Sequence, residues 1–481
     1  MPAVPHVIVC GAGLTGLTTA WQLRQRGIDV TVLETSDVVG GVIRTTRREG
    51  YLVEQGPNSC TLTGQLAGLI DALGLTPLVR PAAPQAQRRY IVRNGRALAV
   101  PSSPLALVRS PLLSVHAKLR LLAEPFIGRH VGTDDESVAS FVRRRLGDEP
   151  LTWAVDPFVS GVYAGDPEQL SVRHAFPRLA ALEQDHGSLL RGALAGVRRS
   201  RISTSPAGVT SGRATMVSFV DGMATLPLAL ADEIGAANIF RDTRVVAIGH
   251  EQDGPMVTVE RDGVHRVIRA DAVVSTMPLH AVTQLALGDA AAQDQAQLGA
   301  VLYPPVVSLA LGFRRSDVGH PLDGFGCLVP GAEQRLTLGV LFSSTLFDGR
   351  APEGYVLLTC FLGGTRHPEL GALSVATLID LIQPELAAML GVTGAPKFVQ
   401  HTVWPRAIPQ YNVGHDAAWR AADAIEAALP GVIVDGQFRR GVSVGDCVAA
   451  GDGIAARAAE MARQSTGNTP GGRARDAVNT H

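Results

Sequence analysis

A glycine-rich turn near the start of the chain constrains its fold more than any other feature. A short apolar run, Val7 to Cys10, leads directly into Gly11-x-Gly13-x-x-Gly16, and a helical pattern follows. A second short apolar run then ends on Glu34. This order of strand, glycine turn, helix, strand and terminal acid predicts a βαβ unit that binds a dinucleotide. The alternative is a tight structural βα turn without a ligand.

Each position of the motif has its own physical role. We expect Gly11 to allow the tight turn, Gly13 to let the backbone approach a pyrophosphate, and Gly16 to let the helix pack closely on the sheet. The helix N-terminus offers unpaired amides and the positive end of its dipole to the phosphates. Glu34 can accept hydrogen bonds from ribose hydroxyls, which argues against a 2′-phosphate there.

A glycine pair just past the second strand narrows the choice of dinucleotide. Gly40-Gly41 is followed by Arg44, and this extension is not part of the NAD motif. It resembles the extended fingerprint of FAD-binding oxidases of the amine-oxidase type, in which the glycine backbone and the arginine attend the pyrophosphate and the flavin. The alternative is a surface turn.

The composition limits the classes of function. A length of 481 residues suggests two or three domains with a large core. A net charge of −1 and an aromatic content of 5% give no sign of a nucleic-acid partner. Five scattered cysteines without a CxxC pair predict a reduced, cytoplasmic protein with neither a disulfide framework nor a metal site. We expect no signal peptide, and no transmembrane helix, because no apolar run reaches about 18 residues.

The rest of the chain alternates between α/β, helical and sheet patterns. We therefore expect an α/β fold with a Rossmann-like FAD-binding domain, a mixed-sheet substrate-binding domain and a helical insertion. The expected FAD-binding segments are 1–85, 211–295 and 401–464. The expected substrate segments are a helical one at 86–210 and a sheet at 296–400, and 465–481 is expected to be a disordered tail.

Three segments allow more than one interpretation. Asn94-Gly95 predicts a hairpin whose first strand carries Arg88 and Arg89. One of the two arginines faces inward if that strand is half-buried, and two solvated arginines are the alternative. Residues 101–129 combine apolar and basic side chains, which fits either a membrane surface or a helix pair packed into its own domain. Residues 156–167 predict a turn segment that either approaches a ligand through its glycines or only connects two elements.

Two helices are expected in the second half of the chain. The first covers 374–390 and is interrupted by Pro384. The second covers Val448 to Ala462 and follows a glycine turn. Its N-terminus, if it faces the cofactor, would suit the edge of the flavin that becomes negative on reduction.

Six stretches carry a resemblance over nearly the whole chain. They are Gly56–Ser59 (GPNS), Asp156–Pro177, Asp323–Pro330 (DGFGCLVP), Leu341–Pro352, Ala407–His415 and Arg440–Cys447 (RGVSVGDC). Together they resemble the protoporphyrinogen and coproporphyrinogen oxidase family, FAD enzymes of haem biosynthesis among the amine-oxidase-like flavoproteins.

The resemblance implies a set of site residues. Those implied to bind FAD are Gly11, Gly13, Gly16, Glu34, Gly40, Gly41, Arg44, Gly56, Pro57, Asn58, Ser59, Val245, Trp404, Val442, Ser443, Val444 and Asp446. For the substrate, Arg89 is implied to pair with a propionate and Gly161 to line the ring through its backbone. Leu328 and Leu341 are implied to sandwich one pyrrole, and Phe361 to stack on another. No residue is implied as an obligatory base.

The implied reaction is the oxidation of protoporphyrinogen IX to protoporphyrin IX. Six electrons leave in three two-electron steps, and dioxygen takes them up as hydrogen peroxide. Coproporphyrinogen III is the alternative substrate, although its four propionates call for more basic residues. An amine or amino-acid oxidase commonly has a lysine near the flavin, and this chain has only Lys118 and Lys397. A non-enzymatic flavin- and porphyrin-binding protein is the remaining class. A homodimer, peripheral contact with the inner face of the cell membrane, and handover to the next haem-pathway enzyme stay open.

Overall fold

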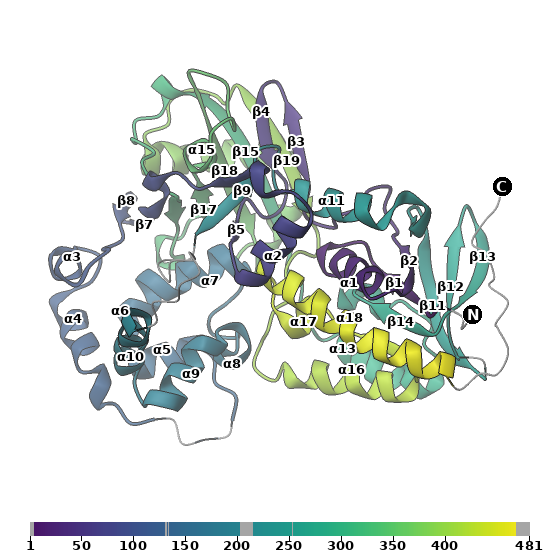
Figure 1. The fold of residues 1–481 in the computed structure, drawn as a ribbon. Coiled ribbons are helices and arrows are strands. Elements are labelled where there is room, and N and C mark those ends of the chain that lie inside the picture. The colour runs from purple at the N-terminus through teal and green to yellow at the C-terminus, as the bar shows by residue number, and fades with distance from the viewer. Residues whose placement is uncertain (1–3, 130–131, 133, 203–214, 253, 468–481) are drawn as a thin grey trace.

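The computed structural model describes residues 4–129, 132, 134–202, 215–252 and 254–467. Three parts are visible in Figure 1. The first is a parallel sheet with its helices, which contains the N-terminal strand. The second is a larger sheet, and the third is a group of helices at the opposite end of the molecule.

The first part is built on a five-stranded parallel sheet in the order β10-β2-β1-β14-β20. These strands are Ile239–Phe240, Asp29–Leu33, His6–Cys10, Ala272–Ser275 and Val432–Val434. They are apolar runs because helices or a second sheet cover both faces. On one face lie α1 (Leu14–Gln25), α2 (Gly64–Ala72), α11 (Thr225–Ile234) and α18 (Val444–Gly467). On the other lie α12 (Leu279–Val282), α13 (Ala292–Leu298), α16 (Asp416–Ala428), α17 (Gln437–Arg440), and the antiparallel strands β11 (Arg244–Glu251), β12 (Gly254–Arg261) and β13 (Val264–Arg269).

The second part is a seven-stranded sheet in the order β19-β15-β18-β17-β16-β7-β8. Its strands are Phe398–Trp404, Val306–Arg314, Tyr355–Gly363, Thr337–Leu341, Gly326–Leu328, Tyr90–Arg93 and Arg96–Ala99. Every neighbouring pair is antiparallel except β16 and β7, which are parallel, so the sheet is mixed. The α/β fold class with a mixed second sheet is therefore confirmed.

The helix that covers one face of this sheet is continuous. α15 runs from Val375 to Leu390 with Pro384 inside it, so the predicted interruption is wrong. A proline inside a helix costs about 3 kcal/mol. Burial of Leu378, Ile382 and Leu386 against the sheet offsets that cost.

The third part contains the short helices that follow β8 in the chain. They are α3 (Pro104–Arg109), α4 (Val115–Leu122), α5 (Val138–Arg145), α6 (Asp148–Pro150), α7 (Asp156–Tyr163), α8 (Val172–Ala175), α9 (Pro177–His186) and α10 (Leu189–Ile202). The turn predicted at 156–167 is thus wrong in its first half. Pro157 lies in the first turn of α7, and a π-helical turn at Leu151–Val155 leads directly into this helix.

The remaining elements join these parts. They are β3 (Thr45–Arg48), β4 (Tyr51–Glu54), β5 (Cys60–Thr61), β6 (Val79–Pro81), β9 (Met216–Phe219) and α14 (Ser343–Leu346). β19 extends across the expected boundary at residue 400, and α18 extends past 465 to Gly467. The tail beyond 467 and the expected boundary at 210 lie outside the described residues. Within them, no helix is long and apolar enough to cross a membrane.

Candidate functional site: a flavin cradle beside an apolar sheet face

The first glycine turn has the geometry of a phosphate cradle. Gly11 has φ of +103°, which only glycine adopts readily. A Cβ on Gly16 would overlap the Gly11 carbonyl oxygen, so the fold itself requires that glycine. Gly13 differs, because a Cβ there would meet no described protein atom within 4 Å. Gly13 is also the N-cap of α1, and no described side chain caps this helix. The helix N-terminus is therefore free to bind an anion.

Glu34 is fixed beside this turn. Its carboxylate accepts a hydrogen bond from the Ala12 amide at 2.8 Å, and two more from the amide and hydroxyl of Ser36 at 2.9 Å each. The Glu34 carbonyl accepts from the Thr243 amide at 2.9 Å. This bond brings Val245, at the bulged start of β11, to the same edge of the parallel sheet.

The glycine pair, Arg44 and Trp404 also lie together. Gly40 and Gly41 both have positive φ, of 101° and 61°. Arg44 Nε donates to the Gly41 carbonyl at 3.0 Å, and its guanidinium lies 5.7 Å from the Trp404 ring centroid. Trp404 Nε1 donates to the Gln55 carbonyl at 2.7 Å, next to the Gly56–Ser59 turn. Gln55 was not among the predicted site residues, because it contributes only its backbone carbonyl.

The far end of the chain completes the cradle. α18 begins at Val444, not at Val448 as predicted, and it packs directly on α1 (Figure 1). Ser443 and Asp446 form a capping box: Ser443 Oγ donates to the Asp446 carboxylate at 2.6 Å and accepts from the Asp446 amide at 3.1 Å. This mutual capping explains why the helix starts one turn earlier than the apolar pattern indicated.

These residues fit a flavin dinucleotide. The uncapped helix with its open Gly13 position suits the pyrophosphate, and the fixed Glu34 carboxylate suits a ribose. The Arg44–Trp404 pair and the α18 N-terminus lie further along the same edge. The structure thus brings the predicted cofactor residues together from four distant stretches of the chain.

One face of the second sheet, the apolar face, carries several apolar side chains next to this cradle, with Ser308 and Thr402 among them. Gly339 in β17 pairs with Leu328 on one side and with Phe361 on the other, and Leu341 lies two residues from Gly339. Paired residues and residues two apart share a face, so the three predicted substrate residues of the sheet point the same way. All three are half-buried. Trp404 belongs to the same face, because Phe361 pairs with Ser308 and Ser308 pairs with Thr402.

Helix α7 lies over one end of this face. A Cβ on Gly161 would overlap Leu328 Cδ2. The glycine therefore allows a close approach between α7 and the Leu328 side chain, and its predicted approach to a substrate ring stays a prediction.

The arginine pair differs from the expectation. β7 begins at Tyr90, so Arg88 and Arg89 precede the strand, and both are exposed. Neither side chain faces inward, because both arginines precede the buried strand. Arg88 forms an ion pair with Asp323, whereas the Arg89 guanidinium lies 5.0 Å from the Phe325 ring centroid.

Phe325 connects Arg89 to the apolar face. Phe325 and Leu341 pack against the same small cluster, formed by Ala86, Leu346 and Phe347. Arg89 therefore lies at the margin of the face that carries Leu341. The DGFG stretch had drawn attention by resemblance, but its role in supporting Arg89 was not predicted.

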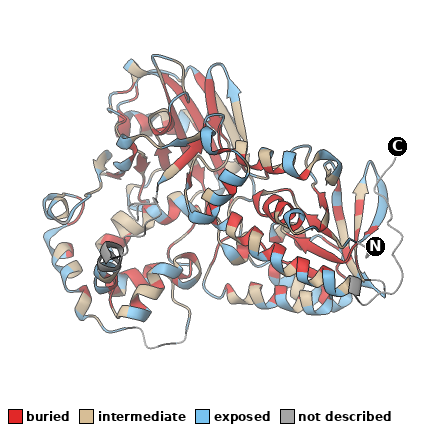
Figure 2. Cartoon of the chain, viewed as in Figure 1, coloured by how far each residue is buried: buried red, intermediate tan, exposed pale blue. Residues whose placement is uncertain are grey.

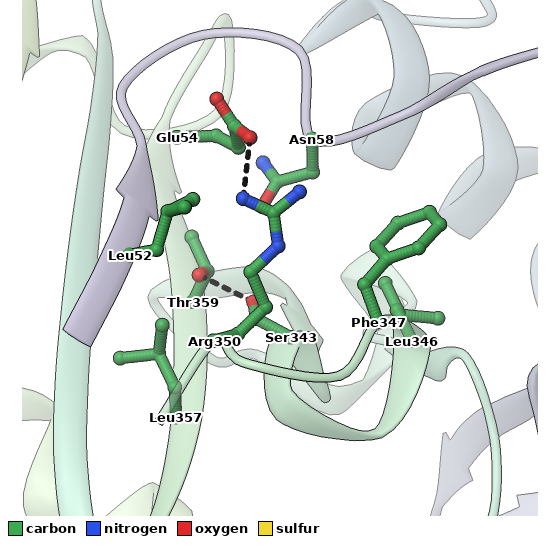
Figure 3. Close-up of a pocket in the computed structure, with 9 residues that line it drawn as sticks. All are labelled: Leu52, Glu54, Asn58, Ser343, Leu346, Phe347, Arg350, Leu357 and Thr359. Atoms are coloured by element: carbon green, nitrogen blue, oxygen red, sulfur yellow. Dashed lines mark hydrogen bonds and ion pairs between the residues drawn. The ribbon is translucent and has the colours of Figure 1, made fainter. Parts of the chain in front are cut away.

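A buried ion pair lies on the same side of the sheet as Phe361, further along β18 (Figure 3). Arg350 Nη1 donates to Glu54 at 2.7 Å, and both side chains line a small cavity of about 10 Å³ together with Asn58. Burial raises the pKa of the Glu54 carboxyl, against the opposing effect of Arg350. The cavity holds about one water molecule at most. It is therefore a small gap in the packing where β4, α14 and β18 meet, and not a ligand site.

Neither lysine of the chain lies at the cradle. Lys118 in α4 donates to the carbonyls of Val108 and Ser110 at 2.9 and 2.8 Å. Lys397 is exposed at the end of β19 opposite Trp404. No lysine is therefore placed where the amine-oxidase alternative would need one.

Fold and site together define a flavin-dependent oxidoreductase, and comparison with known proteins agrees. The chain matches the family of flavin containing amine oxidoreductases over residues 14–459. Protoporphyrinogen oxidase 2, chloroplastic/mitochondrial, of Arabidopsis thaliana is 35% identical over 93% of this chain and 92% of that protein. Coproporphyrinogen III oxidase of Bacillus subtilis is 28% identical over 92% and 95%. A crystal structure from Exiguobacterium shares the fold, with a TM-score of 0.80 and 23% identity over 96% of this chain and 100% of that chain.

The chain belongs to the flavin containing amine oxidoreductases, in the branch that holds the protoporphyrinogen and coproporphyrinogen III oxidases. Its cofactor is FAD, as the sequence predicted.

Proposed function

We propose that this enzyme oxidises protoporphyrinogen IX to protoporphyrin IX, with dioxygen as acceptor and hydrogen peroxide as co-product. The choice of substrate rests on which arginines around the apolar face already form ion pairs with carboxylates. Arg88 is paired with Asp323, and Arg366 is paired with Asp156. Arg89 has no carboxylate partner in the described part of the chain. One unpaired cation suits a substrate with two propionates better than one with four.

The protein's contribution is binding, orientation and exclusion of water. Leu328, Leu341 and Phe361 offer an apolar surface to a flat macrocycle. Arg89, at the margin of that surface, would hold a propionate and so fix the rotation of the ring in its own plane. Bound FAD supplies the two-electron acceptor for each step.

A side-by-side assay tests this proposal. Protoporphyrinogen IX and coproporphyrinogen III are mixed anaerobically with the FAD-loaded enzyme, and the bleaching of the flavin band is followed by stopped flow. We expect protoporphyrinogen IX to reduce the flavin faster, or at a lower substrate concentration, than coproporphyrinogen III does. A preference for coproporphyrinogen III would overturn the substrate assignment, and no bleaching with either would overturn the oxidase itself. Release of hydrogen peroxide on admission of oxygen checks the acceptor.

We also propose that the helical part contacts the surface of an anionic membrane. In α4 the side chains of Val115, Leu119 and Leu122 are 73%, 60% and 70% exposed, at the spacing of one helix face. Phe126, just beyond them, is 86% exposed. This end of the molecule is largely exposed in Figure 2. The exposed Arg109 is near in sequence, and a basic amphipathic surface suits anionic lipids.

Co-sedimentation with vesicles tests this contact. We expect binding to phosphatidylcholine vesicles that contain phosphatidylglycerol, and loss of binding in the Leu119→Asp/Leu122→Asp variant. Leu228→Asp is the matched control, because Leu228 is 52% exposed on α11 in the FAD-binding part. Equal binding by the control and the double variant, or no binding by the wild type, would contradict the proposal.

A further inference from the structure

Helix α7 is held at both ends by the loop that follows β18. At its C-terminal end, the Thr365 amide donates to the Ala164 carbonyl at 2.9 Å. Gly364 lies so close to Ala164 that a Cβ there would be 2.7 Å from the same carbonyl oxygen. At the N-terminal end, Arg366 reaches Asp156. One loop therefore determines where the whole helix lies on the sheet.

The contact at the N-terminal end is a network of charge-assisted hydrogen bonds. Arg366 Nη2 lies 2.7 Å from both carboxylate oxygens of Asp156. The other nitrogen, Arg366 Nη1, donates to the Val329 carbonyl at 2.8 Å. Asp156 Oδ2 also accepts from the Gly331 amide at 2.8 Å. The side chains of Arg366 and Asp156 are only 16% and 19% exposed, so water competes weakly for these bonds.

The network joins two elements of the apolar site. Asp156 is the first residue of α7, which carries Gly161 five residues on. Val329 follows directly after Leu328, the last residue of β16. Arg366 thus ties the start of the helix to the end of the strand, and Gly161 faces Leu328 between these ties.

We propose that Asp156 and Arg366 are positioning residues, which hold the Gly161 backbone against the Leu328 side chain and thereby fix where Leu328 lies beside the flat substrate. This rests on the proposed function, because it takes the contact between Gly161 and Leu328 as one wall of the substrate slot. Neither charged group touches the substrate in this assignment. Asp156 neutralises Arg366, so the pair adds no net charge beside the slot.

Substrate affinity distinguishes positioning from simple structural support. A purely structural pair would change thermal stability and FAD content without a specific effect on substrate affinity. A positioning pair would weaken the porphyrin affinity while the flavin stays bound and reducible.

The experiment compares Asp156→Asn, Arg366→Lys and the control Asp452→Asn, all loaded with FAD. Asp452 pairs with Arg26 at 2.7 Å on the far side of the FAD-binding part, so its loss removes an ion pair away from the slot. Anaerobic titration with porphyrinogen gives the apparent Kd and the limiting rate of flavin reduction. Protoporphyrin IX binding, read by fluorescence quenching, gives an affinity that does not require oxidation. Thermal melting and the flavin-to-protein ratio are recorded for each variant.

We expect both affinities to weaken about tenfold in Asp156→Asn, the loss of about one charge-assisted hydrogen bond. The affinities of Arg366→Lys should fall less. Lysine keeps the positive charge but has one nitrogen in place of the two that bond Asp156 and Val329. The control should keep wild-type affinities. Unchanged affinities in Asp156→Asn, or loss of FAD or folding in both slot variants, would overturn the positioning role.

The outcomes also separate this inference from the proposed function. A wild type that binds protoporphyrin IX but is not reduced by porphyrinogen would contradict the oxidase. Weaker porphyrin binding by Asp156→Asn would then still support the positioning role. A wild type that binds no porphyrin would overturn both.

Discussion

The Leu328 side chain lies directly on the backbone of Gly161. A Cβ on Gly161 would overlap Leu328 Cδ2 and lie 3.7 Å from Leu328 Cγ. Glycine inside a helix is less favourable than alanine by about 0.5–1 kcal/mol. The chain therefore retains a destabilising residue in α7 at the point where the helix meets the apolar face.

Replacing this glycine should separate stability from substrate affinity. We expect Gly161→Ala to leave the melting temperature unchanged or slightly raised, because the flexible end of Leu328 can move. The displaced side chain should narrow the slot and raise KM for porphyrinogen about tenfold. Gly68→Ala is the matched control. Gly68 is also helical, in α2, and a Cβ there meets no described atom within 4 Å, so its KM should not change. A wild-type KM in Gly161→Ala would contradict the close-approach role.

The two glycines at the start of α1 should respond differently to the same substitution. Gly13→Ala fits the fold, because its φ is −70° and its Cβ meets no described atom, so we expect normal melting of the FAD-free protein. Addition of FAD should no longer raise its melting temperature. Gly16→Ala should instead lower the stability of the FAD-free protein by about 1–3 kcal/mol, because its Cβ overlaps backbone. Stabilisation of Gly13→Ala by FAD to the wild-type extent would rule out the phosphate role.

Adjacent arginines provide a second matched comparison. Arg89→Gln removes the cation at the margin of the apolar face, and we expect KM for protoporphyrinogen IX to rise about ten- to a hundredfold. Arg88→Gln should have a smaller effect, since Arg88 is already paired with Asp323. Steady-state kinetics on both variants measures the difference. An Arg88 effect as large as the Arg89 effect would mean that the propionate is held elsewhere.

The indole bond to Gln55 should contribute to FAD retention. Trp404→Phe loses the 2.7 Å hydrogen bond from Trp404 Nε1 but keeps an aromatic ring under Arg44. We expect about fivefold weaker FAD binding, from the loss of about 1 kcal/mol, measured by fluorescence titration of the FAD-free protein. Trp419→Phe is the control, because Trp419 Nε1 donates to the Phe438 carbonyl at 3.1 Å, outside the cradle. It should bind FAD normally.

A histidine pair makes stability depend on pH. The rings of His174 and His415 lie 5.4 Å apart, next to Trp419. Burial lowers the pKa of both, against the opposing charge of Asp416 and Asp135, and Arg173 lowers that of His174 further. The unfolded chain then binds more protons than the folded one. The stabilisation is therefore fully present above the ordinary histidine pKa of about 6.5, and is lost as the pH falls through the lowered folded values.

Urea unfolding from about pH 7.5 to about pH 5.5, on either side of that ordinary pKa, measures this loss. We expect the wild-type midpoint to fall with pH and His415→Gln to show a shallower fall. His116→Gln changes an exposed histidine of α4 and should keep the wild-type slope. An identical slope in all three proteins would contradict the prediction.

The FAD cradle was accessible from sequence because each of its parts has a local signature. Glycines at turns, an acid at a strand end and a glycine pair can be recognised without knowing the tertiary structure. The early start of α18 was missed because the prediction used the spacing of apolar residues, and the Ser443–Asp446 capping box precedes Val448, where that spacing begins. The continuity of α15 through Pro384 depends on packing against a sheet assembled from distant segments.

The substrate side was less accessible for a physical reason. Gly161 and Pro157 are turn signals in isolation, whereas the structure forms a helix there, held at its first residue by Arg366 from 210 residues further along the chain. Arg88 and Arg89 cannot be distinguished locally, since the partner of Arg88 lies 235 residues away. Family resemblance supplied their roles, and the structure supplies the contacts from which those roles can be tested.

The shared sheet face of Trp404 and Phe361 has a mechanical consequence. On the proposed roles, β19 carries Trp404 beside the flavin, and β18, on the other side of β15, carries Phe361 beside the tetrapyrrole. Hydrogen-bonded strands keep a spacing of about 4.8 Å, so the separation of Trp404 from Phe361 is set inside one rigid sheet. The glycine turns and Glu34 belong to the other part of the molecule, so a change in the angle between the two parts would move the flavin relative to this sheet. Trp404 should limit that movement, because its place beside Phe361 does not depend on the angle.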